Sequence, residues 1–526
     1  MAKDPQELVH WADSVVKRVV KEKGEKPKYT VAAGITPSGT IHVGNFREMI
    51  TVDLVARAFE DAGKNVRFIY SWDDYDVFRK VPKNMPQQEM LTEHLRMPIV
   101  DIPDPYGTEK SYARHHEVAV ESSIAKVGLK PEYLYQAEKY RNCEYADGIK
   151  KALDNTKKIK AILDEYRKEP LADSWLPVSG YCPECKHDNV GFSDYDGDHS
   201  IRMTCHDCHK IFDVDIRKAP FLKLPWRVDW PMRWAHEEVD FEPGGKEHST
   251  VGGSYTTAKE IVKLYDWTAP TYQRYDFITI KGKGGKISSS TGNVITVDSC
   301  LEVYEPALLR WLFAGTRPNT EFAISFDLDV IKNYEDFDKC ERIYFKQQAV
   351  KEKEYLKQKR IYELSCTGKP PKAMPYQPSF RHLTTVLLIN SYDIDKTVDA
   401  YRSELKTKED EARLRMRTQC AINWVQKHAP EEFRFEIHDS IPEDMDISEP
   451  MKNVVHEVAD ALKSKEWDAK ELHNTFYEIA RKHDEEPQDF FKTAYHILIR
   501  KPKGPRLANF ILAIGKDSVA YLFSQV

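Results

Sequence analysis

Strand-like and helix-like patterns alternate between about residues 28 and 125, and this alternation limits the possible folds of the 526-residue chain more than any other feature. An apolar run, KYTVAAGI, ends in the turn sequence ITPSGT, and the helical pattern NFREMITVDLVARAFEDAG follows it. Gly63 ends that pattern, and a second strand-like run, VRFIYSW, comes next. A strand, a helix and a strand within about 45 residues are typical of a βαβ unit. We therefore predict an α/β fold with a Rossmann-like parallel sheet that has helices on both faces.

The rest of the chain predicts two further parts. Residues 173–220 carry paired cysteines, whereas helical periodicity dominates from about residue 331 onward, with few glycines. We expect a Rossmann-like domain over residues 1–330, with an insertion at about 95–220, and an all-α domain over residues 331–526.

The charge balance narrows the classes of partner. The chain contains 78 basic and 84 acidic residues, which gives a net charge of −6. Residues 331–526 contain 33 residues of each sign, so the acidic surplus lies in the first 330 residues. This balance excludes a uniformly basic nucleic-acid coat but allows a local basic groove. The basic run KQQAVKEKEYLKQKR at 346–360 is compatible with phosphate contacts and, more simply, with a solvated helix face.

The cysteine count and the lack of long apolar runs indicate the cellular compartment of the protein. The sequence has no run of 18 or more apolar residues, and its N-terminal segment has charges of both signs without an apolar stretch, which is unlike a secretory signal. Nine scattered cysteines, an odd number, favour a reducing compartment. We therefore expect a cytoplasmic protein.

The turn after the first predicted strand, PSGTIHVGN at residues 37–45, has the composition of a phosphate-binding site. Small residues let the backbone approach a ligand closely, and free N–H groups at the start of a helix attract phosphate. His42 is able to donate to a phosphate oxygen, and Asn45 is able to bond phosphate or ribose hydroxyls. An ordinary strand-to-helix turn with a satisfied histidine would show the same pattern. The sequence there matches neither the P-loop motif nor G-x-G-x-x-G.

A second segment, KGKGGKISSSTGN at residues 281–293, combines glycine, lysine and serine. The glycines give mobility, while lysine and serine supply positive charge and donors for polyphosphate. Such a loop can close over a nucleotide and stabilise the charge that develops on a leaving pyrophosphate. Taken alone, the segment would equally suit a flexible basic linker.

Two cysteine pairs have the spacing C-x2-C-x19-C-x2-C, which is typical of a structural zinc knuckle. The pairs are formed by Cys182, Cys185, Cys205 and Cys208. Four thiolates leave no open coordination position, so we expect about one zinc ion per chain with a structural role. Four unpaired surface cysteines are the plainer alternative, and three nearby histidines are alternative ligands: His187, His206 and His209.

Taken together, the segments at 37–45 and 281–293 resemble the HIGH and KMSKS signatures of class I aminoacyl-tRNA synthetases. The surrounding sequence narrows the likeness, because ITPSGTIHVGNFRE, WDDYDVFRKVP and LPWRVDWPMRWAHEEVDFEPGGKEH resemble the class I lysyl-tRNA synthetase family. YDFITIKGKGGKISSSTGN, RPNTEFAISFDLDV and KGPRLANF extend the resemblance to nearly the whole chain. The resemblance implies activation of lysine with ATP and transfer to the terminal adenosine of lysine tRNA.

The resemblance also assigns an ATP site to the two signature segments. It implies that His42, Asn45, Lys286 and Ser288 are catalytic, and that ATP is bound by Pro37, Ser38, Gly39, His42, Gly44, Asn45, Lys286, Ser288 and Ser290. Ser289 stands where the general signature has its second lysine, so Lys281 or Lys283 is an alternative source of charge. Magnesium is expected with ATP, but the sequence does not single out a carboxylate as its ligand.

Candidate lysine contacts follow from the chemistry of the substrate. An ε-ammonium needs a carboxylate or an aromatic partner. The run WDDYD at 72–76 follows a predicted strand at its carboxyl end, where parallel sheets bind ligands, although a solvated turn is the alternative. We expect contacts from Asp73, Asp74 or Asp76, from Gly34 and Thr36 at the end of the first strand, and, through the resemblance, from Trp230 and His248. For Trp230, core packing is the alternative.

Two further expectations depend on the resemblance. The helical domain over 331–526 is expected to read the anticodon, with bases stacked on aromatic side chains. Some family members carry a second metal cluster at the segment that matches residues 104–116. Here Asp104 and His115 remain, but Thr108 and Glu109 occupy the Cys-His positions, so a second zinc ion is not expected.

Three alternative functions stay compatible with these residues. A synthetase that charges glutamate would need an arginine for an acidic side chain. A zinc-knuckle RNA-binding protein would bind RNA without regard to ATP or lysine. A nucleotidyltransferase would use ATP without tRNA.

Overall fold

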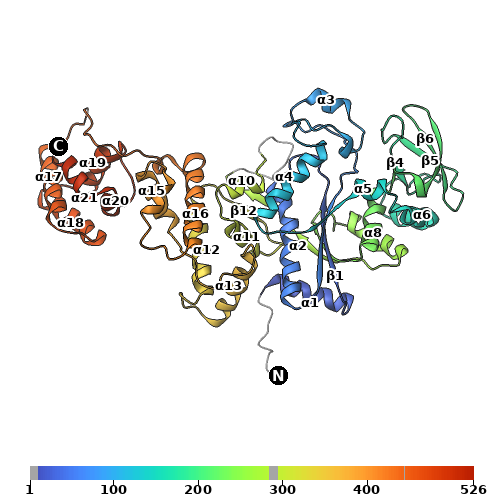
Figure 1. Ribbon diagram of the computed structural model, residues 1–526, viewed down its shortest axis with the longest axis horizontal. Coiled ribbons are helices and arrows are strands. Elements are labelled where there is room, and N and C mark those ends of the chain that lie inside the picture. The colour runs from blue at the N-terminus through green and yellow to red at the C-terminus, as the bar shows by residue number, and fades with distance from the viewer. Residues whose placement is uncertain (1–9, 283–293, 444) are drawn as a thin grey trace, which may run out of the picture. The chain divides into compact units, whose positions relative to one another are not determined.

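The computed structural model describes residues 10–282, 294–443 and 445–526, and a five-stranded parallel sheet forms its first half (Figure 1). The strand order is β10-β9-β1-β2-β3, and each neighbouring pair is parallel. The strands are β1 (Tyr29–Ile35), β2 (Val66–Trp72), β3 (Glu132–Tyr135), β9 (Val239–Gly245) and β10 (Thr271–Tyr275). The predicted parallel α/β sheet is thereby confirmed.

Helices of varied length surround this sheet. In chain order they are α1 (Trp11–Lys23), α2 (Val43–Asp61), α3 (Gln88–Glu93), α4 (Tyr112–Lys126), α5 (Gln136–Arg141), α6 (Ala146–Asp154), α7 (Thr156–Asp164), α8 (Trp226–His236), α9 (Ser254–Ile261), α10 (Val297–Leu301), α11 (Pro306–Ala314) and α13 (Glu352–Ser365). Short strands complete this part: β4 (Ser179–Gly180), β5 (Val190–Ser193), β6 (Ser200–Cys205), β7 (Ile211–Asp215), β8 (Leu222–Lys223), β11 (Ile278–Ile280) and β12 (Phe322–Ile324).

Strand β1 presents alternate residues to two helical layers. Tyr29 stacks on Phe59 of α2, with ring centroids 4.9 Å apart, whereas Ala32 packs with Trp230 and Trp234 of α8. Because consecutive side chains of a strand point to opposite faces, these two contacts lie on opposite sides of the sheet. Helix α2 therefore covers one face, and α8 with α9 covers the other.

The cysteine-rich part is inserted between two strands of the central sheet. It follows β3 and precedes β9, and it contains the antiparallel sheet β5-β6-β7 and the antiparallel pair β4-β8. The central sheet itself continues inside the range 95–220 that the sequence predicted as an insertion, because β3 at 132–135 pairs with β2. The segment EYLY is only four residues long, so its strand character is weak in the sequence.

The chain divides into two compact units. The first contains the described residues up to 300 together with 309–324 and 350–370, and the second contains 301–308, 325–349 and 371–526. Helix α13 thus belongs to the first unit, although it lies beyond the boundary near residue 330 that the sequence suggested.

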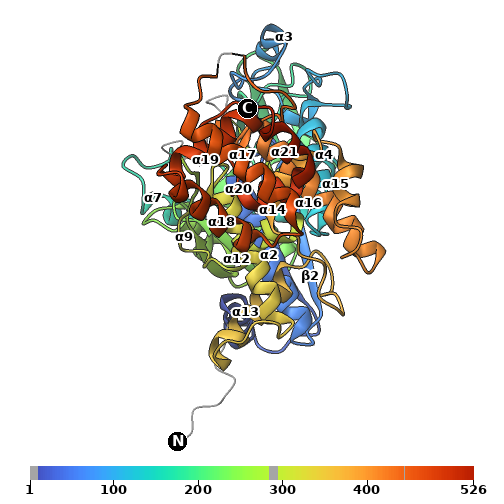
Figure 2. The ribbon, with the colours of Figure 1, turned by 90° about the vertical axis from the view of Figure 1, so that its left-hand side faces the viewer.

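The second unit consists of helices wherever the structure describes regular elements (Figure 2). They are α12 (Asp329–Tyr344), α14 (Phe380–Ile389), α15 (Ile394–Asp399), α16 (Lys408–Lys427), α17 (Glu449–Ser464), α18 (Ala469–Lys482), α19 (Pro487–Ile499), α20 (Leu507–Ile514) and α21 (Lys516–Phe523). Buried ion pairs join α16 to α12, with Arg417 2.8 Å from Asp338 and Arg413 2.7 Å from Glu341. The helical C-terminal part of the predicted fold is confirmed. Within the described part of the chain, no helix is both long and apolar enough to cross a membrane.

Candidate functional site

A cavity opens at the carboxyl ends of β1, β2 and β9, where parallel sheets bind ligands. Four of the residues that the sequence singled out line it together: Gly34, Asp73, Trp230 and His248. Glu48, Ser71, Gln136, Trp226, Arg233, Trp234 and Glu242 contribute to the same wall. A Cβ atom at position 34 would lie 2.9 Å from the Ser71 carbonyl oxygen, so only glycine fits this point of β1. We refer to this space as the sheet-end cavity.

The other candidates from the same sequence segments lie elsewhere. Asp74 is buried outside the cavity lining, and its carboxylate accepts the Ala137 N–H at 2.8 Å, near the start of α5. Burial raises the pKa of Asp74 to about 8. Thr36 donates its hydroxyl to Asp76 at 2.9 Å, and Asp76 also pairs with Lys223 at 2.7 Å. These three residues line a neighbouring groove, whereas Asp74 is bonded to the start of α5.

The sequence did not single out two cavity carboxylates that have no ion pair among the described residues, Glu48 and Glu242, nor a third, Glu237, which is paired with Arg67 at 2.8 Å. Glu48 accepts the Gly34 N–H at 3.1 Å and the Tyr275 hydroxyl at 2.5 Å. Glu242 accepts the indole N–H groups of Trp230 at 3.1 Å and Trp234 at 2.5 Å. Burial raises the pKa of both carboxyls to about 7. A charged residue within the buried strand VDFEPGG is an anomaly that could have pointed to Glu242.

Among the described residues, Arg233 is the one arginine that lines the cavity, and it is already paired. Arg233 lies 2.6 Å from Asp73 and 3.2 Å from Asp229, and it also donates to the Ser71 hydroxyl at 2.8 Å. All three ionic side chains are largely buried. Two carboxylates already neutralise the charge of Arg233. Arg233 therefore does not offset the negative charge that Glu48 and Glu242 acquire when they ionise.

The turn at 37–45 begins helix α2. His42 is the N-cap, and the Asn45 side-chain oxygen accepts the His42 backbone N–H at 3.2 Å, which is the reciprocal half of a capping box. A Cβ atom at position 44 would lie 2.8 Å from the His42 imidazole, so the absence of a side chain at Gly44 lets the ring lie across the turn. His42 and Asn45 are therefore held together at the N-terminus of α2.

Neighbouring segments hold the earlier part of this turn. The Tyr112 hydroxyl donates to the Ser38 carbonyl at 3.0 Å, and a Cβ atom at Gly39 would lie 3.3 Å from Pro82. The Ser38 N–H is bonded to the Thr36 carbonyl at 2.8 Å. The turn between Pro37 and Gly39 is thus packed against residues from α4 and from the segment after β2.

Most of the second signature segment lies outside the described residues. Lys286, Ser288 and Ser290 belong to that part, as do Lys283 and Ser289. On its two sides, the Lys281 N–H bonds the Ile324 carbonyl at 3.0 Å, and the Ile295 carbonyl accepts the Val43 N–H at 2.8 Å. Ile295, which follows the segment, therefore lies at the start of α2.

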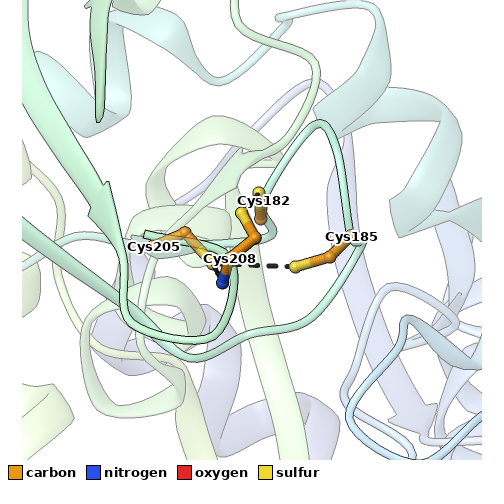
Figure 3. Close-up of side chains that lie close together, drawn as sticks. All are labelled: Cys182, Cys185, Cys205 and Cys208. Atoms are coloured by element: carbon orange, nitrogen blue, oxygen red, sulfur yellow. Dashed lines mark hydrogen bonds between the residues drawn. The ribbon is translucent and has the colours of Figure 1, made fainter. Parts of the chain in front are cut away.

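The four cysteines converge as the spacing predicted (Figure 3). Their sulfur atoms all lie within 4.8 Å of one another, and the Cys182–Cys208 and Cys185–Cys205 sulfur separations are both 3.6 Å. A tetrahedral ion with Zn–S bonds of about 2.3 Å would place its ligands about 3.8 Å apart. The donor set and its spacing therefore fit a four-thiolate zinc ion.

The backbone around the cysteines repeats one geometry. Cys182 donates its N–H to the His187 carbonyl at 2.9 Å, and Cys205 donates to the Lys210 carbonyl at the same distance. The residue that follows the second cysteine of each pair has a positive φ, 67° at Lys186 and 57° at His209. Two equivalent tight loops thus present the sulfurs. His187 bonds Asp207 at 2.9 Å, beside the cluster rather than within the four-sulfur set.

The segment at 104–116 is held together by hydrogen bonds. The Asp104 carboxylate accepts the backbone N–H groups of Tyr106, Thr108 and Glu109 at 2.7–3.0 Å. His115 lies 3.5 Å from Asp104. Among the residues that the structure describes, this pair is not joined by a third metal-binding side chain.

The basic run at 346–360 overlaps helix α13. Its last residue, Arg360, pairs with Asp13 at 2.7 Å and with Asp61 at 2.6 Å. Arg360 therefore attaches α13 to α1 and to the end of α2.

Comparison with known proteins gives consistent matches. The family model described as "tRNA synthetases class I (K)" matches residues 9–368. A lysine–tRNA ligase of Borreliella burgdorferi is 49% identical over 518 residues, which are 98% of this chain and 99% of that protein. A lysine–tRNA ligase of Thermococcus kodakarensis is 41% identical over 97% of this chain and 98% of its own length. Among solved structures, a glutamate tRNA ligase from Elizabethkingia meningosepticum aligns with a TM-score of 0.46 at 14% identity, over 94% of this chain and 98% of that one.

Proposed function

This chain belongs to the class I (K) family of tRNA synthetases, and from that premise we propose that it ligates L-lysine to the 3′ end of lysine tRNA at the expense of ATP. The reaction proceeds through a lysyl adenylate, with release of pyrophosphate and then AMP. The observation that carries the proposal beyond the family is the sheet-end cavity, which holds unpaired carboxylates and a neutralised arginine beside a signature turn.

The charges of the sheet-end cavity suit a substrate with two ammonium groups. Glu48 and Glu242 face the cavity without an ion pair among the described residues, whereas the other two cavity carboxylates, Asp73 and Glu237, are paired with arginines. Burial raises the pKa of both carboxyls and so disfavours their charged forms, and a bound ammonium would stabilise those charges in a desolvated site. The tryptophans at 226, 230 and 234 supply ring faces for the aliphatic chain and for cation–π contact.

The same charges disfavour glutamate. A substrate carboxylate would need a cation that is free to bind it, but Arg233 is held between Asp73 and Asp229. A second carboxylate beside Glu48 and Glu242 would add repulsion in a poorly hydrated space. Lysine therefore fits this cavity better than glutamate does.

ATP is assigned to the helix start at 37–45. The N-terminus of α2, a helix of 19 residues, attracts phosphate through its dipole. The His42 ring lies against Gly44, and we assign six residues of this turn to ATP: Pro37, Ser38, Gly39, His42, Gly44 and Asn45. Lys286, Ser288 and Ser290 complete the site in this proposal, supported by the position of Ile295 against Val43.

The chemistry requires placement rather than a protein nucleophile. The lysine carboxylate attacks the α-phosphorus of ATP, and the bond to pyrophosphate breaks. The chain holds both substrates side by side at the carboxyl ends of the strands, and it stabilises the negative charge that develops on the leaving pyrophosphate. Mg²⁺ bound with ATP would supply further neutralisation of the phosphates.

The remaining assignments complete the proposal. Cys182, Cys185, Cys205 and Cys208 hold one structural zinc ion, supported by their sulfur spacing. The helical second unit is assigned to the anticodon, and the Rossmann-like part over about 1–330 to catalysis. We place the activity in the cytoplasm, where translation uses charged tRNA.

A direct test uses the purified full-length protein with lysine tRNA, ATP and labelled lysine. Acid-stable attachment of lysine to the tRNA, dependent on ATP, is the expected result. Attachment of glutamate under the same conditions, or RNA binding that is indifferent to ATP and lysine, would favour one of the alternative functions instead.

A further inference from the structure

A second group of metal-binding side chains adjoins the four-cysteine cluster and shares one residue with it. The group consists of Cys185, His187 and Asp207, whose ligand atoms all lie within 4.8 Å of one another. Cys185 comes from the first of the two loops that carry the sulfurs (Figure 3), and His187 follows it by two residues. Asp207 belongs to the second loop, between Cys205 and Cys208. We refer to Cys185, His187 and Asp207 as the outer cluster.

The imidazole and the carboxylate of the outer cluster already face each other. Nδ1 of His187 lies 2.9 Å from Oδ2 of Asp207, and the Asn189 side-chain amide donates to the other carboxylate oxygen at 2.5 Å. A tetrahedral zinc ion with bonds of about 2.0 Å to nitrogen and oxygen would separate these two ligand atoms by about 3.3 Å. An ion therefore needs only a small movement of the two side chains to enter between them.

The backbone fixes both loops, while the outer cluster stays open to solvent. The His187 carbonyl accepts the Cys182 N–H at 2.9 Å, and the Asn189 carbonyl accepts the His206 N–H at the same distance. The side chains of His187 and Asp207 are nevertheless 34% and 35% exposed. An ion from solution can thus reach ligands whose backbone positions are already set.

The local charge favours a second cation. Four thiolates carry four negative charges, of which one zinc ion neutralises two, and the Asp207 carboxylate adds another beside them. The two lysines of these loops already have contacts of their own. Lys210 pairs with Glu184 at 3.0 Å, and Lys186 donates to the Pro183 carbonyl at 2.9 Å. The negative charge of the cysteine loops is therefore available to a further divalent ion.

We propose that the outer cluster binds a second zinc ion, held by the His187 imidazole, the Asp207 carboxylate and the shared thiolate of Cys185, with water as the remaining ligand. A thiolate and an imidazole suit zinc, whereas Ca²⁺ and Mg²⁺ prefer an all-oxygen set. The Cys185 sulfur keeps lone pairs after it binds one ion, so it can bridge two. Because one of its three protein ligands is shared, the second ion binds more weakly than the first and is lost when the purified protein is desalted.

The first test titrates the outer cluster in the full-length protein. Protein desalted to one zinc ion per chain is titrated with Zn²⁺ in competition with a chromophoric chelator, and one further equivalent is expected to bind. In His187→Ala and in Asp207→Asn, the affinity for this equivalent should fall by about 100-fold, while the first zinc ion is retained. His206→Ala is the matched control, because His206 is an exposed histidine next to Asp207 that belongs to neither cluster.

Three results of this titration would overturn the proposal. The wild-type protein takes up no further equivalent, or His206→Ala weakens it as much as His187→Ala does. In the third case both variants of the outer cluster lose the first zinc ion, which would show that His187 and Asp207 only support the four-cysteine site.

The second test asks whether Cys185 shares its sulfur. Co²⁺ is added to the protein that holds one zinc ion, and thiolate-to-cobalt charge-transfer absorption is expected while the zinc content stays at one per chain. Cobalt bound without that absorption would be held by imidazole and carboxylate alone and would contradict the shared thiolate. Release of an equal amount of zinc would contradict it as well, since cobalt would then occupy the four-cysteine site.

Discussion

The Tyr275 hydroxyl, at the end of β10, donates a hydrogen bond of 2.5 Å to Oε2 of Glu48 on α2. The other carboxylate oxygen of Glu48 accepts the Gly34 N–H at 3.1 Å. These two donors come from β1 and β10, which β9 separates, and fix the carboxylate at the wall of the sheet-end cavity. Glu48 therefore presents a placed acceptor to an ammonium rather than a mobile charge.

This contact predicts that Glu48→Gln weakens lysine binding. The variant keeps an oxygen for the Gly34 N–H but loses the charge, so the KM for lysine should rise roughly 10- to 100-fold, as for a lost charge-assisted hydrogen bond. Tyr275→Phe should show a smaller rise, about 3- to 10-fold. Steady-state aminoacylation at varied lysine measures both. Tyr272→Phe is the matched control, because its hydroxyl donates to the Gly245 carbonyl instead, and an equal effect there would contradict the role of Glu48.

The raised pKa values predict how lysine affinity depends on pH. Burial places the pKa of Glu48 and Glu242 at about 7, so both carboxyls are largely neutral at pH 6 and ionised at pH 8. An ammonium prefers the ionised form, hence the KM for lysine should fall as pH rises from 6 to 8 and level off above it. Comparison of pH profiles for wild type and E48Q checks this, since the variant should show a shallower dependence. A KM that rises over the same interval would be inconsistent with carboxylate recognition.

The Gly44 contact predicts a loss of rate without a loss of fold. A methyl group there would lie 2.8 Å from the His42 imidazole and would displace the ring. Because displacements of about 1 Å can cost roughly 100-fold in rate, Gly44→Ala should lower kcat by about that factor. Gly368→Ala is the control, since a Cβ atom there meets nothing within 4 Å. Normal turnover in Gly44→Ala, with an unchanged melting temperature, would argue against His42 at the phosphates.

The cysteine cluster predicts one zinc ion per chain. Elemental analysis of the purified protein should give a ratio of about one, and Cys185→Ser should lose the metal and lower the melting temperature, because metal binding contributes to folding. Cys143→Ser should change neither quantity, since Cys143 lies outside the cluster. A ratio near zero or near two would refute the assignment.

The sequence patterns predicted two strands and the cysteine cluster, but not which aspartate of the run WDDYD faces the cavity. KYTVAAGI and VRFIYSW predicted β1 and β2 because long apolar runs between turn signals identify buried strands, and the cysteine spacing predicted the convergence of the four sulfurs. The run WDDYD did not reveal which aspartate faces the cavity, because that depends on the course of the turn after β2. Asp73 lines the cavity, and Asp74 bonds a backbone N–H of α5.

Other features depend on tertiary structure in ways that local patterns do not record. Glu48 lies on a helix that is buried along most of its length, and only the packing of α2 against β1 and β10 brings it beside Gly34 and Tyr275. Arg233 is three residues beyond Trp230 in the sequence, yet its neutralisation by Asp73 requires the sheet and α8 to meet. Sequence periodicity does not reveal an ion pair between two residues that are 160 positions apart.

The central claim is that the chain attaches lysine, and no other amino acid, to tRNA. Total tRNA is incubated with ATP, the purified protein and each labelled amino acid in turn, and the acid-precipitable label is counted. Label from lysine alone, recovered on lysine tRNA, is the expected result. Transfer of another amino acid in place of lysine would contradict the assignment of lysine as the substrate.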